Sequence, residues 1–103
     1  MKKLLSITAF LLIYISNIKA YDIEIDNIYY NLDVTEKTAT VTNNGTKSYQ
    51  NSSIIIPNKI NHNGTKFNVE IIAANAFDGC SNITSISLPK NLRKIEDFAF
   101  KIY

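Results

Sequence analysis

Apolar and polar residues alternate along the chain from Tyr21 to Val41. The apolar positions of this pattern are Ile23, Ile25, Ile28, Tyr30, Leu32, Val34, Ala39 and Val41. A period of two residues places every second side chain on one face of a strand, so it is typical of half-buried strands. We therefore predict a mainly β fold. No helix of ordinary length is predicted, and residues 73–77 are expected to form a single turn at most.

Two asparagine-glycine turn signals, Asn43-Asn44-Gly45 and Asn63-Gly64, lie between β-prone runs. Asparagine and glycine tolerate the positive φ angles that tight hairpin turns require. We therefore predict two hairpins at these signals. The first would join residues 38–42 to residues 47–50, and the second would join residues 54–60 to residues 67–72.

A six-residue motif occurs twice in the second half of the chain. Ile72-x-x-x-Ala76-Phe77 recurs as Ile95-x-x-x-Ala99-Phe100, at an offset of 23 residues. A fixed period of this kind is the signature of a repeat architecture. A second correspondence, at an offset of 32 residues, relates Ile54, Ile56, Pro57 and Ile60 to Ile86, Leu88, Pro89 and Leu92. The difference of nine residues equals the stretch 61–69, so the upstream copy is predicted to carry a hairpin insertion.

Residues 83–91 fit the leucine-rich pattern L-x-x-L-x-L-x-x-N, with isoleucine at two of the leucine positions. Ile86 and Leu88 are two apart on a predicted strand, so both side chains should point inward. Aromatic and aliphatic side chains should fill the space between successive coils. The predicted core of the repeats consists of Ile72, Ala76, Phe77, Cys80, Ile83, Ile86, Leu88, Leu92, Ile95, Ala99 and Phe100.

Residues 69–100 resemble the BspA-type leucine-rich repeat, which occurs in surface proteins of bacteria and of some parasitic protists. Residues 21–50 are similar to the β-hairpin segment that often precedes such repeats. The resemblance implies N-terminal β-hairpins followed by the first one to two coils of a right-handed solenoid, used outside the cell for adhesion or protein recognition, with no catalytic residues. We expect a signal peptide at 1–20, a hairpin segment at 21–53 and an incomplete solenoid at 54–103.

The first twenty residues have the parts of a secretory signal: Lys2 and Lys3, an apolar run over residues 4–15, and a polar stretch that ends at Ala20. The apolar run is too short for a membrane span, which needs about 20 residues. We expect cleavage after Ala20, so that the mature chain begins at Tyr21. No membrane span should remain after cleavage.

Charge and composition narrow the class of partner. Removal of residues 1–20 takes away three lysines and no acid, so the formal net charge falls from +2 to −1. Without a basic cluster beyond Arg93-Lys94, the chain has no electrostatic footprint for nucleic acid. The single cysteine cannot form an intrachain disulfide, so either packing or partners must stabilise a domain of 83 residues.

The sequence offers little catalytic or metal-binding chemistry. Asp22, Glu24 and Asp26 alternate on one strand face, which we interpret as solvated, and His62 is expected at the surface near a turn. Cys80 is expected to be buried and inert. We predict no catalytic residue, no metal and no cofactor. The glycosylation sequons begin at Asn44, Asn51, Asn63 and Asn82, and they matter only in a host that glycosylates.

The sequence thus predicts a secreted or surface-associated module that binds an extracellular or host-surface protein. One alternative is an N-terminal cap fragment of a longer repeat protein with a structural role only, and another is a secreted enzyme. We also expect self-association through an uncapped last coil, because solenoids bury their core between neighbouring coils. Aromatic and arginine side chains dominate interface hot spots. The candidate contacts are therefore Tyr29, Tyr49, Arg93 and Tyr103.

Overall fold

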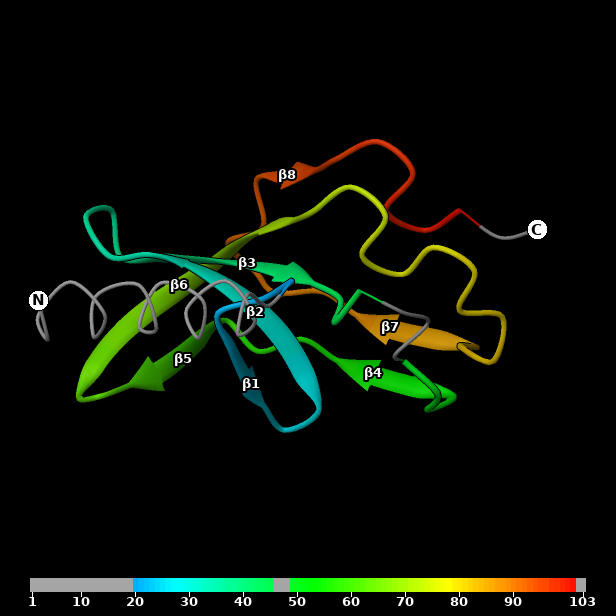
Figure 1. Ribbon diagram of the computed structural model, residues 1–103, viewed down its shortest axis with the longest axis horizontal. Helices are drawn as coiled ribbons and strands as arrows, with labels where there is room; N and C mark the ends of the chain where they lie inside the picture. The colour runs from blue at the N-terminus through cyan, green and yellow to red at the C-terminus, as the bar shows by residue number, and fades with distance from the viewer. Residues whose placement is uncertain (1–19, 46–48, 102–103) are drawn as a thin grey trace, which may run out of the picture.

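The computed structural model describes residues 20–45 and 49–101, and the regular structure of these residues is entirely β (Figure 1). Five strands follow each other in the order β1-β2-β3-β6-β5, β8 adds to β6, and β4 pairs with β7 in a separate sheet. The predicted signal segment lies outside the described residues, apart from Ala20. The strands are β1 (Ile23–Ile25), β2 (Ile28–Asp33), β3 (Thr38–Thr42), β4 (Ser53–Ile55), β5 (Lys59–His62), β6 (Thr65–Ile72), β7 (Ser85–Ser87) and β8 (Lys94–Ile95).

The N-terminal strands β1, β2 and β3 form an antiparallel meander. Asp26 and Asn27 connect β1 to β2 with φ angles of 50° and 66°, and Ile25 faces Ile28 across the turn. Two consecutive positive φ angles are the mark of a type I′ turn, whose twist matches that of the strands. Burial alternates along β2 and β3, as the period of two predicts.

The first predicted hairpin is wrong. β3 pairs on one side with β2, antiparallel, and on the other with β6, parallel, so neither edge is left for residues 47–50. The turn that reverses the chain lies before β3, at residues 34–37, where Lys37 has a φ of 57°. Asn43-Asn44-Gly45 instead follows the end of β3.

The second predicted hairpin is confirmed in its central part. Asn63 and Gly64 have φ angles of 52° and 80°, and His62 pairs with Thr65 at the start of an antiparallel ladder between β5 and β6. β4, however, belongs to the other sheet. The nine-residue insertion thus forms the turn and the adjoining ends of this hairpin. It lies within a repeat and does not form a separate domain.

Contacts between the repeats fall at the two offsets found in the sequence. Ile54 pairs with Ile86, and the Asn58 side chain accepts a hydrogen bond from the Lys90 N–H at a separation of 32 residues. Ile72 pairs with Ile95, and Glu70 bonds to Arg93 at a separation of 23. We call residues 52–83 the first coil and residues 84–101 the second coil. The second coil therefore stacks on the first with equivalent residues side by side at these positions.

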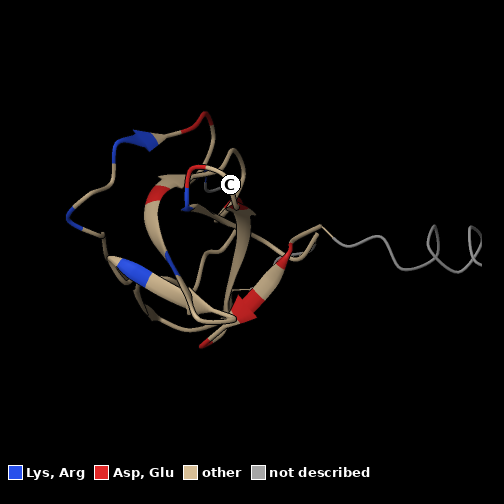
Figure 2. Ribbon diagram, turned by 90° about the vertical axis from the view of Figure 1, so that its left-hand side faces the viewer, with Lys and Arg blue, Asp and Glu red and all other residues tan. Residues whose placement is uncertain are grey.

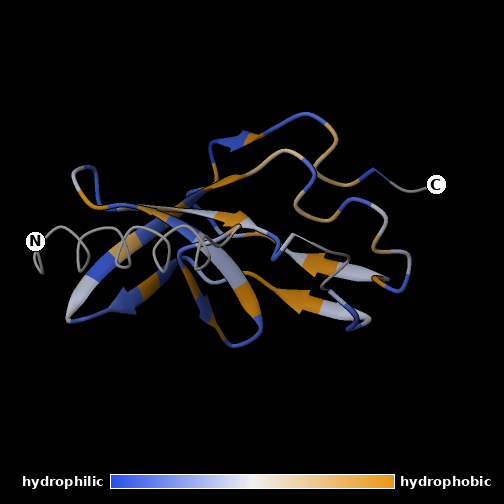
Figure 3. Cartoon of the chain, in the orientation of Figure 1, coloured by the Kyte–Doolittle hydropathy of each residue, from blue (hydrophilic) through white to orange (hydrophobic). Residues whose placement is uncertain are grey.

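The hydrophobic core lies where β3 and β6 run side by side and extends into the first coil. Apolar residues alternate with polar ones along these strands (Figure 3). The larger fully buried side chains come from β2, β3, β6 and the turn after β6. They are Tyr30, Phe77, Ile72, Val41 and Val69.

Two predicted core residues of the second coil are wrong, because Leu88 and Ile95 are each 47% exposed. Ile72 lies between Val41 on β3 and Ile95 on β8, whereas Ile95 has a partner strand on one side only among the described residues. Leu88 likewise follows β7, which pairs only with β4 in the described chain. Ala99 of the same coil is 2% exposed, so the absence of a further layer in the described chain exposes these two larger side chains and not every repeat position.

Candidate protein-binding surface

A row of aromatic rings connects the N-terminal hairpin to the second coil. The ring centroids of Tyr21 and Tyr29 are 4.8 Å apart, and those of Tyr29 and Tyr49 are 5.6 Å apart. Tyr49 then contacts Phe77 at 4.5 Å, and Phe77 stacks on Phe100 at 5.2 Å with an angle of 4° between the ring planes. These spacings are those of favourable aromatic pairs. The row of rings therefore connects the N-terminal hairpin segment to the two coils.

Tyr49 was a predicted contact residue, and the structure contradicts this because its side chain is 3% exposed. Its hydroxyl donates a hydrogen bond to the carbonyl oxygen of Thr42 and accepts one from the Tyr29 N–H at 3.1 Å. Burial raises the pKa of Tyr49 well above its usual range. The hydroxyl therefore stays protonated and satisfies one backbone group on β2 and one at the end of β3.

The remaining predicted contacts do not form one patch. Tyr29 is half-buried within the aromatic row, and Tyr103 lies outside the described residues. Arg93 is exposed on the second coil, where its Nε lies 2.8 Å from a Glu70 carboxylate oxygen. Of these four residues, Arg93 alone is both described and fully on the surface.

The outward face of β4 and β7 is a surface that our sequence reasoning did not single out. Ser53, Ile55, Ser85 and Ser87 are exposed there, while Ile54 and Ile86 point the other way, into the coils. The Ser53 and Ser85 hydroxyl oxygens are 3.1 Å apart, and Ile55 is 72% exposed opposite Ser87. In the leucine-rich pattern, the x positions on either side of Ile86 belong to outward-pointing side chains. These positions would have indicated this face.

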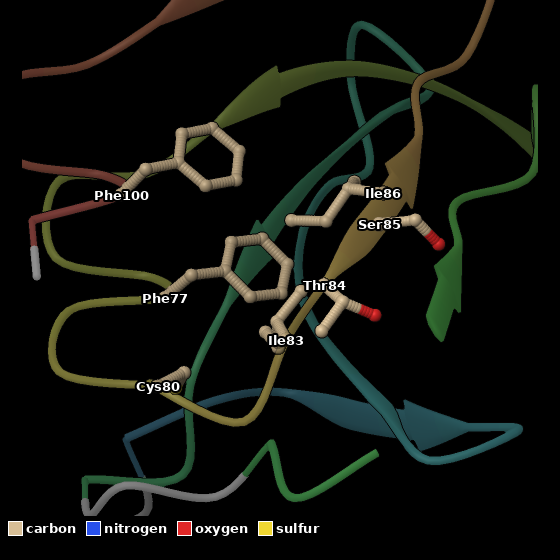
Figure 4. Close-up of a pocket in the computed structure, with 7 residues that line it drawn as sticks. All are labelled: Phe77, Cys80, Ile83, Thr84, Ser85, Ile86 and Phe100. Atoms are coloured by element: carbon tan, nitrogen blue, oxygen red, sulfur yellow. The ribbon is translucent and has the colours of Figure 1, made fainter. Parts of the chain in front are cut away.

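A groove of about 180 Å³ lies beside β7, between the aromatic rings and the strand (Figure 4). The rings of Phe77 and Phe100 lie one above the other on one side, with Ile83 and Ile86 across from them. Cys80, which is buried and unpaired, forms part of the floor. The residues that line the groove carry no charge: they are Phe77, Cys80, Ile83, Thr84, Ser85, Ile86 and Phe100.

Charged and metal-binding groups do not define a site in the described chain. Figure 2 shows acidic and basic residues interspersed over the strands and loops. Residues 20–45 and 49–101 contain no group of three or more His, Cys, Asp or Glu side chains that could hold a metal ion. Asp22 accepts a hydrogen bond from the Leu32 N–H at 2.8 Å, and His62 is half-buried beside the Asn63 side chain.

The sequon asparagines lie at the surface to different degrees. Asn51, Asn63 and Asn82 are exposed, whereas Asn44 is half-buried and donates to the Tyr29 hydroxyl at 3.4 Å. Among the described residues, no helix is long and apolar enough to cross a membrane.

Comparison with solved structures shows the class of protein. A leucine-rich repeat protein from Bacteroides ovatus is 33% identical, with a TM-score of 0.67 over 78% of this chain and 21% of the other. A leucine-rich repeat protein from Bacteroides capillosus is 19% identical, with a TM-score of 0.55 over 76% of this chain and 72% of the other. The fold is therefore that of a leucine-rich repeat protein. The chain spans about a fifth of the length of the Bacteroides ovatus protein.

A family model described as the BspA type leucine rich repeat region (6 copies) matches residues 50–102. The chain belongs to this BspA-type family, as the repeat motif indicated. Membership supports a repeat protein that works through protein–protein interaction. A search of curated proteins found no match.

Proposed function

We propose that the chain is exported and acts as a secreted or cell-surface module that adheres to or binds an extracellular protein, without catalysis. The observation that carries the proposal is the outward face of β4 and β7, where Ile55 is 72% exposed among serine side chains. A large apolar side chain within a small polar rim is the arrangement of an interface hot spot. Serine hydroxyls on both sides offer hydrogen bonds that fix the orientation of a partner.

A binding experiment with a matched control tests this surface. The protein would be screened by surface plasmon resonance against purified extracellular and matrix proteins. Ile55→Asp should weaken a detected interaction at least about tenfold, roughly 1.4 kcal/mol. Val34→Asp is the control because Val34 is also 72% exposed but lies in the turn after β2. Equal losses for the two variants, or no binding to any protein of the panel, would argue against the proposal.

Export rests on the N-terminal signal features, and it has its own test. Mass analysis of protein recovered from the culture medium should give a chain that begins at Tyr21. Recovery of a membrane-embedded form that retains Met1 would contradict both the cleavage site and the location.

The structural-cap alternative is favoured by a different observation. β3 pairs in parallel with β6 and covers one side of the first coil, as a capping element of a solenoid does. If this is the whole role of the chain, Val41→Ala should destabilise the fold, while Ile55→Asp should leave every measured property unchanged. An effect of Ile55→Asp on binding separates the two functions.

A further inference from the structure

Asparagine is followed by glycine at two places in the chain, Asn44-Gly45 and Asn63-Gly64. Such a pair is chemically labile, because the backbone nitrogen of the second residue can attack the side-chain carbonyl of the asparagine. Glycine favours this attack, since it has no Cβ and its backbone adopts many conformations. Asparagine is accordingly one of the thermolabile residues of proteins. The surroundings of the two pairs differ, so the structure predicts which of them reacts.

Asn63-Gly64 has little packed against it. The pair forms the tip of the β5–β6 hairpin, at the end of the molecule away from β4 and β7 (Figure 1), and both residues are exposed. Apart from chain neighbours, no atom lies within 4 Å of the point that a Cβ on Gly64 would occupy. The Gly64 N–H donates to the Asn61 Oδ1 at 3.1 Å, an exposed hydrogen bond that water can replace. Little therefore opposes movement of the Gly64 nitrogen toward the Asn63 side chain.

Asn44-Gly45 is held by more contacts. Asn44 is half-buried, and its Nδ2 lies 3.4 Å from the Tyr29 hydroxyl. The Gly45 N–H donates to the Asn43 Oδ1 at 2.7 Å, and the Asn43 Nδ2 donates in turn to the Asn75 carbonyl at 2.8 Å. Attack by the Gly45 nitrogen would have to disturb these linked hydrogen bonds. This pair should therefore react more slowly than Asn63-Gly64.

His62 supplies the exposed pair with a proton donor. The His62 Nε2 lies 3.3 Å from the Asn63 Nδ2. Nδ2 is the atom that departs as ammonia, and it departs only after it gains a proton. A protonated imidazole at this distance can give that proton as the bond to Nδ2 breaks, which is general acid catalysis. His62 is the single histidine of the chain, so Asn44 has no imidazole beside it.

We propose that Asn63 converts to aspartate and isoaspartate without an enzyme, with His62 as the proton donor. The Gly64 nitrogen gives its proton to solvent and forms a bond to the Asn63 Cγ. The Cγ–Nδ2 bond breaks, and Nδ2 takes a proton from His62 and leaves as ammonia. Water then opens the cyclic imide, at Cγ to give aspartate or at the backbone carbonyl carbon to give isoaspartate.

The product changes the chemistry of the hairpin tip. It has lost the glycosylation sequon at Asn63, and its new carboxylate lies in a groove that Asp22 and His62 also line. Isoaspartate also lengthens the backbone within the turn, and the turn sets the pairing of His62 with Thr65. The reaction therefore alters charge and strand register at one defined place.

Peptide mapping of the purified full chain tests the proposal, after expression in a host that does not glycosylate. Trypsin cleaves after lysine, so the two pairs fall in separate peptides, residues 38–47 and 60–66. During incubation at neutral pH, aspartate and isoaspartate should accumulate in the 60–66 peptide. The 38–47 peptide should react at least about threefold more slowly, a ratio that one net hydrogen bond accounts for. In urea the difference should shrink, because the hydrogen bonds around Asn44 are lost.

Two variants separate the chemistry of His62 from the shape of the hairpin. His62→Gln keeps a polar side chain without the proton donor, and it should slow the reaction at Asn63 at least about threefold. Thr65→Val is the matched control, because Thr65 pairs with His62 and valine keeps its β-branched shape, so the rate should not change. Equal slowing by the two variants would overturn the role of His62. An unmodified 60–66 peptide, equal rates for the two peptides of the folded chain, or a difference that persists in urea would overturn the site.

Discussion

The two coils carry similar residues at equivalent positions, but several large apolar side chains are buried in the first coil and partly or largely exposed in the second. Ile56, Ile72 and Phe77 of the first coil are 2%, 0% and 2% exposed. Their counterparts Leu88 and Ile95 are each 47% exposed, and Phe100 is only half-buried. The first coil lies between the N-terminal strands and the second coil, whereas the second coil has a described neighbour on one side only. Burial in a solenoid is thus a property of the neighbouring layer as well as of the residue.

The largest expected effect comes from truncating the covered member of the stacked pair. Phe77→Ala should lower the free energy of unfolding by about 3 to 5 kcal/mol, because it removes a fully buried ring from the centre of the aromatic row. Phe100→Ala should cost only about 1 to 2 kcal/mol, since part of its ring is already in contact with water. Urea titration of the monomer measures both. Equal losses of free energy for the two variants would contradict the difference in burial between the two coils.

Removal of the Tyr49 hydroxyl should have the next largest effect. Tyr49→Phe keeps the ring contacts but leaves the Thr42 carbonyl and the Tyr29 N–H without this partner. Loss of hydrogen bonds to such groups costs about 1 to 3 kcal/mol. Tyr29→Phe should cost less than about 1 kcal/mol, because its half-buried hydroxyl can bond to water. Thermal unfolding of the two variants should rank them in this order, and the reverse order would contradict the role of Tyr49.

Alkaline pH should lower the free energy of unfolding, because the core contains a buried tyrosine, Tyr30. Burial, and then the negative charge of Asp26, raise the pKa of Tyr30 from 10.0 to about 12. Between these values the unfolded chain loses the phenolic proton and the folded chain keeps it, so the free energy of unfolding falls as the pH rises. Below pH 10 this contribution is fully present. Tyr30→Phe should flatten the decline in urea titrations from pH 10 upward, and an unchanged slope would exclude Tyr30 as its source.

The smallest effect is expected for the ion pair that bridges the coils. Glu70→Gln removes the charge that lies 2.8 Å from the Arg93 Nε, but the Arg93 side chain is 59% exposed. Exposed pairs contribute about 0 to 1 kcal/mol, and salt screens them. At low salt the free energy of unfolding of the variant should lie within about 1 kcal/mol of that of the unaltered chain, and at high salt the two should be equal. A large loss that persists in salt would mean that this pair, rather than packing, holds the second coil.

Short-range patterns in the sequence predicted much of the fold. The two offsets, the insertion and the turn at Asn63-Gly64 are visible as self-similarity and local turn chemistry, and the structure uses each of them. The family resemblance was also confirmed. These features could be predicted because the repeats resemble each other in sequence and the turn depends on adjacent residues.

Features that depend on distant layers could not be predicted in this way. The parallel pairing of β3 with β6 joins residues about 30 positions apart, and a local turn signal pointed to the wrong partner. Tyr49 looked like a surface aromatic because its partners, Thr42 and Phe77, belong to different segments. Leu88 and Ile95 fit the repeat pattern, and their exposure depends on a neighbour that no periodicity within the chain reveals.

The two coils are copies of one unit, and stacking of their equivalent phenylalanine rings helps to hold them together. A double-mutant cycle with Phe77→Leu and Phe100→Leu, followed by urea titration at concentrations where the chain is monomeric, measures this stacking directly. We expect a coupling energy of about 0.5 to 1.5 kcal/mol, in line with aromatic pairs in contact. Additive losses, with no coupling between the two positions, would show that the rings do not stack and would contradict the repeat frame.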